Sequence, residues 1–319
     1  MIICQPPIRP KNKHLQSILA SAKLRLLRLR SGNPVVENQA EQLLKGSLAT
    51  LLGYHTPHPD NGDTMAILLH GWEGSSQSTY IQLLANSLYQ EGLDIFRLNL
   101  RDHGDSHHLN EDIFHSCRLD EVVDAVTQIQ QLFPGKKFIL CGFSLGGNFA
   151  LRVASRASAA GLSFQHVFAV SPPVIPKNSM DAIHQSRLYT GYFLKKWKRS
   201  LHIKNRLYPH LFEDNSWQQE NNLERLTQML ILKHTEFKKT DDYFAGYSIT
   251  PEIIRAINCP THVITAWDDP VIPFKDFSTI DRLPQIKILT TAYGGHCGFI
   301  QGWRMRSWIE DYVINEIRK

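Results

Sequence analysis

The sequence has few cysteines, and their spacing is irregular. Only five occur among 319 residues, at Cys4, Cys117, Cys141, Cys259 and Cys297. None forms a C-x-x-C pair, and no spacing indicates a zinc site or a framework of disulfides. We therefore expect reduced thiols, and we expect the functional site to work with no metal and no cofactor.

Long apolar runs and long runs of like charge are also absent. No uninterrupted apolar stretch could span a bilayer, and the first ten residues lack the charged and apolar regions of a secretory signal. The formal net charge of +5 is only mildly basic, and no run of basic residues indicates a nucleic-acid surface. These absences favour a cytoplasmic protein with no nucleic-acid partner.

The sequence does have enough apolar residues for a large core, because 42% of its residues are hydrophobic and 20% are charged. From Met65 onward, short apolar runs alternate with amphipathic segments, which indicates an α/β fold with a mostly parallel central sheet flanked by helices. The expected strands are Ala66–Leu69, Ile95–Leu98, Lys137–Cys141, His166–Val170, His262–Thr265 and Ile286–Leu289. The expected helices are Thr79–Gln90, Leu119–Leu132, Leu145–Ala159 and Trp303–Ile317.

The α/β domain is expected over residues 65–319, with one interruption. Residues 172–251 contain prolines, many aromatic residues and the basic cluster Lys195–Arg199, but no clear buried strand. We interpret this interval as a helical insertion between two strands of the sheet. Such an insertion is typical of a lid over a site, although it can also serve only as extra packing.

Residues 1–64 are expected to form an N-terminal extension. Within it, Lys13–Arg30 has apolar residues at helical intervals, with Lys and Arg between them. The apolar positions are Leu15, Ile18, Leu19, Ala22 and Leu26. This basic amphipathic helix could contact a membrane surface peripherally, at the inner face, or it could pack on its own domain with its basic groups in solvent.

The segment Leu140–Phe149, LCGFSLGGNF, places one serine between glycines. An apolar run precedes Gly142 and an amphipathic segment follows Ser144, so the serine stands where a strand would turn sharply into a helix. Glycines relieve the crowding that a Cβ atom would create in such a turn. The G-x-S-x-G pattern in this context predicts that Ser144 is a nucleophile.

A serine hydroxyl is a weak nucleophile and needs a base that an acid orients. In folds with this turn, the acid and then the histidine follow the serine along the chain. The expected strand His262–Thr265 leads to Asp268 and Asp269, and we choose Asp269 as the acid, with Asp268 as the alternative. The last expected strand leads to a glycine-rich loop with His296, the predicted general base.

The oxyanion of an acyl-transfer intermediate needs two N–H donors. The backbone N–H of Leu145, at the start of the helix after the serine, is one candidate, and that of Trp72, in a loop after an early strand, is the other. We expect Gly71, next to Trp72, and Phe143, next to Ser144, to contact the substrate. His70 is expected to brace the loop and not to transfer protons.

Four segments of the chain together resemble the α/β-hydrolase superfamily and, within it, the YheT-like branch, which includes ABHD-type lipases and ester-forming acyltransferases. They span nearly the whole sequence and are Asn12–Ile18, His70–Ser76 with Ser78 and Tyr80, Gly142–Asn148, and Gly294–Phe299. The first two are more specific than the serine turn. The segment Glu41–Thr64 departs from the family pattern, because it shows no clear strand-turn-strand signal.

The resemblance implies the same site as the residues do, with Ser144 as nucleophile, Asp269 as orienting acid and His296 as base. It also implies hydrolysis of carboxylic esters through an acyl-enzyme, with small-molecule or lipid esters as substrates. Two alternatives stay open. An alcohol could intercept the acyl-enzyme, which would make the protein an acyltransferase, or the pocket could bind a lipid or a partner without catalysis.

Overall fold

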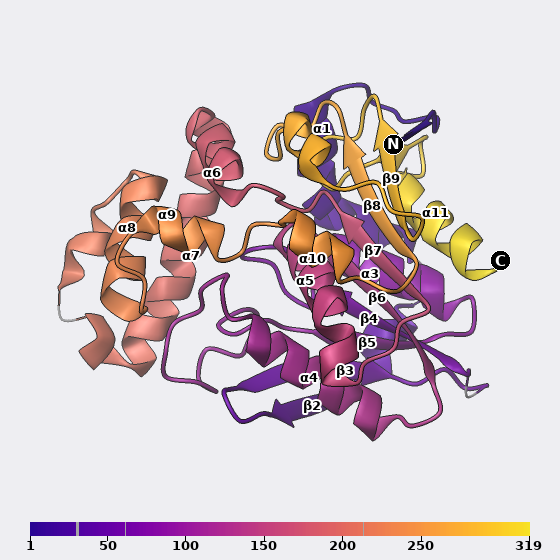
Figure 1. Cartoon of the computed structure of the whole chain (residues 1–319), viewed down its shortest axis with the longest axis horizontal. Helices are drawn as coiled ribbons and strands as arrows, with labels where there is room; N and C mark the ends of the chain where they lie inside the picture. Colours follow the sequence, from indigo (N-terminus) through magenta and orange to yellow (C-terminus); the bar gives the residue numbers. More distant parts are fainter. Residues whose placement is uncertain (30–31, 61, 213) are drawn as a thin grey trace.

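In the residues that the structure describes, 1–29, 32–60, 62–212 and 214–319, the chain folds around a nine-stranded sheet (Figure 1). The structure is a computed structural model. The strands are β1 Ile2–Cys4, β2 Ala40–Lys45, β3 Thr50–Thr56, β4 Thr64–Leu69, β5 Asp94–Leu98, β6 Lys137–Phe143, β7 His166–Val170, β8 Thr261–Ala266 and β9 Ile286–Thr291. Their order is β1-β9-β8-β7-β6-β4-β5-β3-β2. The pairs β2–β3 and β3–β5 are antiparallel, and the other adjacent pairs are parallel.

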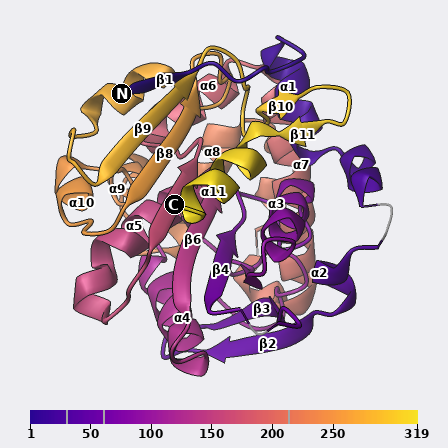
Figure 2. The same cartoon turned by 90° about the vertical axis from the view of Figure 1, so that its right-hand side faces the viewer.

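Helices cover both faces of this sheet (Figure 2). One face carries α3 Thr79–Tyr89 and α11 Trp308–Ile317, and the other carries α4 Leu119–Leu132 and α5 Leu145–Ala160. Because both faces are covered, the central parallel strands are continuous apolar runs, such as Met65–Leu69 in β4. The expected fold class, a mostly parallel sheet flanked by helices, is confirmed. Shorter elements are α2 Pro34–Glu37 and the 3₁₀ helix η4 Phe274–Thr279.

All six expected strands are present, but β1, β2 and β3 were not expected. They come from the segment that the sequence indicated as an N-terminal extension, and they join the same sheet. β2 lies at the edge, and Leu44 is its one buried residue. An edge strand keeps polar residues such as Glu41 and Gln42, which weakens the apolar alternation that predicts strands.

The expected start of the C-terminal helix at Trp303 was wrong. A hairpin of β10 Ile300–Gln301 and β11 Arg306–Ser307 occupies that region, and α11 begins at Trp308. Ser307 and Glu310 form a capping box, in which each side chain accepts from the other residue's backbone N–H. This reciprocal cap determines where the helix begins.

The expected single helix near the N-terminus is two elements. α1 Lys13–Ser21 ends at Ala22, whose backbone is extended, and the 3₁₀ helix η1 Lys23–Arg28 follows. Arg30, the last residue of the expected helix, lies outside the described residues.

The described part of the interval between β7 and β8 is helical, as expected (Figure 1). It contains α6 Pro176–His184, α7 Arg187–Leu207, η2 Pro209–Phe212, η3 Asn215–Gln218, α8 Leu223–His234, α9 Thr240–Ala245 and α10 Pro251–Arg255. The helices α6 to α9 form a lobe beside the sheet, and α10 packs back against α5. Side chains of this lobe share a cavity with Ser144, which directly follows β6.

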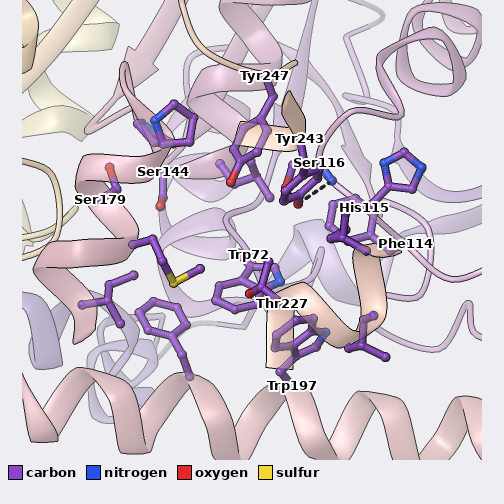
Figure 3. Close-up of a pocket in the computed structure, with 18 of the residues that line it drawn as sticks. Trp72, Phe114, His115, Ser116, Ser144, Ser179, Trp197, Thr227, Tyr243 and Tyr247 are labelled. Atoms are coloured by element: carbon purple, nitrogen blue, oxygen red, sulfur yellow. Dashed lines mark hydrogen bonds between the residues drawn. The ribbon is translucent and has the colours of Figure 1, made fainter. Parts of the chain in front are cut away.

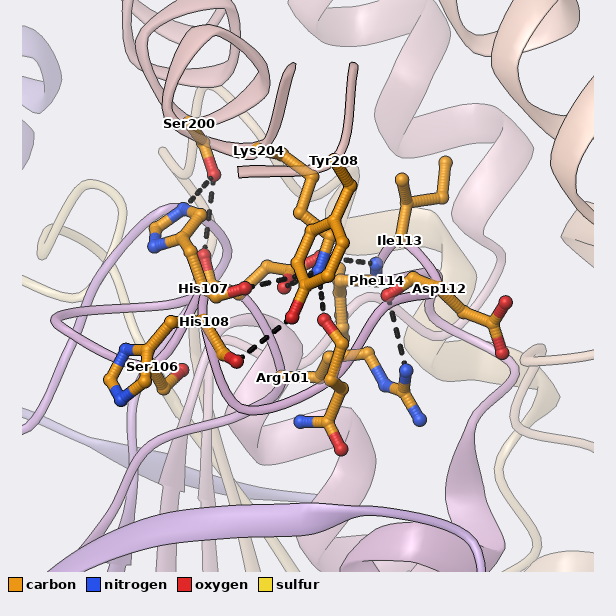
Figure 4. Close-up of polar contacts among 12 residues, drawn as sticks. Arg101, Ser106, His107, His108, Asp112, Ile113, Phe114, Ser200, Lys204 and Tyr208 are labelled. Atoms are coloured by element: carbon orange, nitrogen blue, oxygen red, sulfur yellow. Dashed lines mark hydrogen bonds and ion pairs between the residues drawn. The ribbon is translucent and has the colours of Figure 1, made fainter. Parts of the chain in front are cut away.

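A buried lysine ties the lobe to the loop after β5 (Figure 4). The Lys204 ammonium, on α7, donates to Asp102 Oδ1 at 2.8 Å and to the backbone oxygens of His107, at 3.2 Å, and Asn110. Asp102 also accepts from the Phe114 N–H at 2.8 Å. A buried ion pair that loses one partner leaves an uncompensated charge. These contacts therefore fix α7 against the loop.

A buried carboxylate joins η1 to α11. Glu310 accepts two bonds from the Arg28 guanidinium, each at 2.9 Å, and lies 3.5 Å from the guanidinium of Arg25. Besides the Ser307 N–H of the capping box, it also accepts from the Ser87 hydroxyl of α3, at 2.8 Å. The side chains of Arg25 and Glu310 are 1% and 3% exposed. The segment before β2 is thus locked onto the helices of one face.

We expect Glu310→Ala to lower the free energy of unfolding by about 3 kcal/mol, because it leaves a buried guanidinium without its carboxylate. Asp311→Ala is the matched control, since the neighbouring pair with Arg306 is more than a third exposed on both sides and should contribute no more than about 1 kcal/mol. Urea unfolding of both variants checks this. Equal losses would contradict the assigned role of Glu310.

Candidate active site

Ser144 lies in a strained turn between β6 and α5. Its φ and ψ are 53° and −121°, a backbone conformation that residues other than glycine rarely adopt. A Cβ atom at Gly142 would lie 2.0 Å from the backbone oxygen of Gly146, and one at Gly146 would lie 2.4 Å from that of Leu69. The glycines are therefore required by the close approach of β4, β6 and the first turn of α5.

The structure brings the three residues expected to form the triad into one hydrogen-bonded chain. His296 Nε2 lies 2.9 Å from Ser144 Oγ, and His296 Nδ1 lies 3.0 Å from Asp269 Oδ2. The other carboxylate oxygen of Asp269 accepts from the N–H groups of Val271 and Ile272, at 2.8 and 2.9 Å. The fully buried Asp269 carboxylate is thus held by three donors.

Asp268, the alternative acid, has a different partner. Its Oδ1 accepts from the N–H of Gly295, at 2.9 Å, on the loop that carries His296. Among the described residues, no hydrogen bond joins either oxygen of Asp268 to the His296 ring. Asp268 therefore holds the backbone of the histidine loop, and Asp269 holds the ring.

The surroundings of His296 stabilise its protonated ring. Burial of the ring opposes protonation, but the sulfur of Cys297 and the carboxylate of Asp269 outweigh it, so the pKa of His296 lies well above its usual value. A neutral imidazole can take the serine proton, and the imidazolium that forms is stabilised by Asp269. The ring is suited to a proton that arrives and leaves during a reaction.

Helix α1 packs directly against the histidine loop. The Ser17 hydroxyl accepts from the backbone N–H of His296 at 2.8 Å and donates to the carbonyl of Lys13 at 2.7 Å. A Cβ atom at Gly295 would lie 2.4 Å from the Lys13 oxygen, and one at Gly298 would lie 2.4 Å from the Gln16 oxygen. The segment Asn12–Ile18 carries part of the family resemblance, but its support of the histidine loop is a tertiary contact that no local sequence pattern indicates.

Two backbone N–H groups beside Ser144 are without an acceptor among the described residues, those of Trp72 and Leu145. Leu145 is the first residue of α5, where the helix dipole favours negative charge. Gly71 lets the loop approach, since a Cβ atom there would lie 3.1 Å from that of Ser144. His70 braces the loop through the Gly71 oxygen at 2.8 Å and the N–H of Leu100 at 3.1 Å. Among the described residues, both N–H groups are therefore available to donate to an oxyanion.

The expected substrate contact of Phe143 is not present in the structure. Its side chain is 3% exposed and packs against Tyr80, with ring centroids 4.9 Å apart. Successive residues of a strand point to opposite faces of the sheet, and Phe143 joins the core on the α3 face, whereas Leu140 joins the core on the α5 face. Phe143 therefore supports the turn from behind.

Two cavities meet at Ser144. One is lined mainly by apolar side chains of the lobe and of the sheet end, among them Met180 and Leu230 (Figure 3). The other is an open cleft of about 930 Å³ between α1, α7 and the loops after β4 and β5. Trp72 and Phe193 line both cavities, and their rings stack with centroids 5.1 Å apart. In the described part of the chain, no cluster of three or more His, Cys, Asp or Glu side chains could hold a metal ion.

Comparisons with known proteins identify the family and the fold. A family model described as alpha/beta hydrolase fold matches residues 67–302. YheT of Escherichia coli (strain K12), whose name describes it as an esterase, is 25% identical over 282 residues, which are 86% of this chain and 82% of that protein. A monoacylglycerol lipase of Saccharomyces cerevisiae (strain ATCC 204508 / S288c) is 23% identical over 292 residues, which are 84% of this chain. This chain spans 63% of the yeast protein's length.

Among solved structures, the Pyrococcus furiosus esterase Pf2001 is similar to this chain. The TM-score is 0.58 at 15% sequence identity, and the match covers 88% of this chain and 89% of the esterase. At this identity the similarity shows the fold alone.

Ser17→Ala should slow turnover of an ester roughly tenfold without unfolding the protein, because the backbone of His296 loses its partner and the ring shifts from its position. Ser278→Ala is the control, since that exposed hydroxyl makes the same kind of bond, to Lys275, in η4. Steady-state kinetics with a chromogenic ester give kcat, and thermal unfolding reports the fold. An unchanged kcat in Ser17→Ala would show that α1 does not position the histidine.

Proposed function

Because this chain belongs to the alpha/beta hydrolase fold family, we propose that it is a serine-dependent hydrolase of carboxylic esters. The observation that carries the proposal is the chain of hydrogen bonds from Ser144 through His296 to Asp269, 2.9 and 3.0 Å long. Beside this serine lie Trp72 and Leu145, whose backbone N–H groups have no acceptor among the described residues. Nucleophile, base, orienting acid and oxyanion donors are the parts that acyl transfer needs.

In the proposed mechanism, Ser144 Oγ attacks the ester carbonyl while His296 Nε2 takes its proton. The oxyanion of the tetrahedral intermediate accepts from the N–H groups of Trp72 and Leu145. The intermediate collapses, the C–O bond to the alcohol breaks, and His296 returns the proton to the departing oxygen. Water, deprotonated by His296, then attacks the acyl-enzyme and releases the carboxylic acid and Ser144.

The apolar cavity is suited to the acyl chain. It begins at Ser144 and continues under α6 and α8, between side chains such as Met180, Ile183 and Leu230 (Figure 3). Burying a chain of methylene groups there would contribute about 0.8 kcal/mol for each group. The presence of a monoacylglycerol lipase among the relatives supports lipid esters as the substrate class.

The pH profile of kcat/KM tests the assigned base and acid. Only the neutral ring can accept a proton, so activity should fall as the pH drops through the raised pKa of His296, with its midpoint above about 6.5. Asp269→Asn removes the carboxylate, so it should move the midpoint down and reduce kcat about a thousandfold or more.

Asp268→Asn is the matched control for that profile, because its amide oxygen can still accept from Gly295. We expect a loss of less than about tenfold and an unchanged midpoint. The assignment fails if the two variants behave alike, or if Asp268→Asn is the more damaging.

A peripheral contact with lipid membranes belongs to the same proposal. Leu15, Ile18, Leu24 and Leu27 of α1 and η1 are 43%, 53%, 57% and 62% exposed. The buried residues of α1 are instead the small Ala20 and the polar Gln16, which donates to backbone oxygens of other segments. When apolar side chains face solvent and a polar one faces the core, the outer surface is suited to burial in an apolar environment such as the acyl chains of a membrane.

Other residues at the mouth of the cleft support the membrane contact. Leu188 and Tyr192 of α7 are 52% and 42% exposed, and the basic residues Lys23 and Arg199 line the same opening. This combination suits a surface with acyl chains and anionic headgroups. Within the described ranges, no helix has both the length and the apolar character needed to cross a bilayer.

Co-sedimentation with vesicles of phosphatidylcholine and phosphatidylglycerol tests the contact. The wild-type protein should sediment at low salt, and the double variant Leu24→Ser/Leu27→Ser should stay largely in the supernatant, because it loses two exposed apolar side chains. Leu132→Ser is the control, since Leu132 is 54% exposed at the end of α4. Wild-type protein that does not sediment, or equal sedimentation of the double variant, contradicts the proposal.

A further inference from the structure

The open cleft has polar groups that the proposed mechanism leaves unused. Glu73, His103 and Lys196 line it together with Ser144 and His296. Glu73 follows Trp72 in the loop after β4, His103 lies in the loop after β5, and Lys196 is on α7. None of these three lines the apolar cavity. They therefore stand on the side of Ser144 where the alcohol part of an ester would lie.

Glu73 adopts a strained backbone conformation. Its φ is +54°, in the left-handed region that favours glycine, although the same short loop has glycine at positions 71 and 74. Glutamate has a conformational cost at this φ, and residues held in such strained conformations cluster at functional sites. The carboxyl group makes no hydrogen bond with any described residue and faces the cleft.

The Glu73 carboxyl is suited to neutral hydroxyl groups. Burial raises the pKa of Glu73 to about 8, the Lys196 ammonium opposes this, and the Asp102 carboxylate adds to it. The group is then mostly protonated at neutral pH. A protonated carboxyl has one O–H donor and one carbonyl acceptor, and an alcohol offers the complementary acceptor and donor.

His103 provides a buried acceptor on the same wall. Its Nδ1 lies 2.7 Å from the carbonyl oxygen of Arg101, which can only accept, so Nδ1 bears the hydrogen. Nε2 is then a lone-pair acceptor, and it has no donor among the described residues although the side chain is 3% exposed. Burial keeps the ring neutral by lowering the pKa of His103. A buried acceptor of this kind calls for an O–H or N–H donor.

Lys23 and Arg199 also line the cleft, at its mouth, but the groups beside Glu73 and His103 do not favour an anion. The Lys196 ammonium donates to the backbone oxygen of Glu73 at 3.2 Å and lies 4.9 Å from the centre of the Tyr192 ring. Part of its capacity to bind an anion is therefore already taken by these two contacts. The Asp105 carboxylate also lines the cleft, and so does that of Asp102, which is paired with Lys204. A phosphate offers mostly acceptors, which would leave His103 Nε2 unsatisfied. An alcohol with several hydroxyls satisfies both groups.

We propose that Glu73 and His103 form a subsite for hydroxyl groups on the alcohol part of the ester, so that the preferred leaving group is a small neutral polyol such as glycerol. One hydroxyl donates to His103 Nε2, and another exchanges hydrogen bonds with the Glu73 carboxyl. The inference rests on the proposed ester hydrolysis and adds the chemical class of the leaving group. It also gives a reason for the strained glutamate beside the oxyanion donors.

Binding to the Ser144→Ala protein tests the subsite without turnover. Titration calorimetry compares two ligands with the same acyl chain, monooctanoyl glycerol and ethyl octanoate. The glyceryl ester should bind about tenfold more tightly, and Glu73→Gly should reduce this preference to about twofold or less. Glycine tolerates the positive φ, so this variant should keep its fold, which thermal unfolding checks. Glu73→Gln retains a donor and an acceptor and should keep most of the preference.

Gln131→Ala is the control, because Gln131 is exposed on α4, lines neither cavity and should not change the ratio of the two affinities. Equal affinities for the two esters, or a preference that survives Glu73→Gly, would overturn the subsite. Tighter binding of monooctanoyl glycerol phosphate than of monooctanoyl glycerol would also overturn it and would assign the cleft to phosphate. Failure of the proposed function is a separate result, in which the wild-type protein hydrolyses neither ester.

Discussion

The close approach of β4, β6 and α5 around Ser144 is the constraint on which the site depends. Because the backbone of Gly146 lies against Leu69 and that of Gly142 against Gly146, the chain must turn within one residue and hold Ser144 at φ 53°. The turn lifts the hydroxyl off the sheet end and leaves the first N–H of α5 facing the same space. The free N–H of Trp72, the ring of His296 and the two cavities are all arranged around that one point.

The N-terminal segment is part of this arrangement and not an appendage to it. Its first strand extends the sheet beside β9, α1 supports the histidine loop through Ser17, and η1 is locked onto α11 through Glu310. The same segment forms one wall of the open cleft and presents Ile18 to solvent. The position of His296, the shape of the open cleft and the outer apolar surface therefore depend on one short stretch of chain.

The sequence predicted best what local patterns determine. Buried parallel strands are continuous apolar runs, so β4 to β9 were found, whereas the edge strand β2 has one buried residue and was missed. The serine turn could be recognised from spacing, but whether Asp268 or Asp269 faces His296 depends on the turn after β8. Two further features depend on tertiary packing. One is the side of the sheet to which Phe143 points, and the other is the contact between Ser17 and His296, which are 279 residues apart in the sequence.

The central claim is that Ser144 is an activated nucleophile, and covalent modification by a fluorophosphonate tests it most directly. After incubation with the probe, intact mass and peptide mapping should locate one adduct at Ser144, and the Ser144→Ala and His296→Ala proteins should stay unmodified under the same conditions. A folded wild-type protein that stays unlabelled, or an adduct on another residue, would contradict the account.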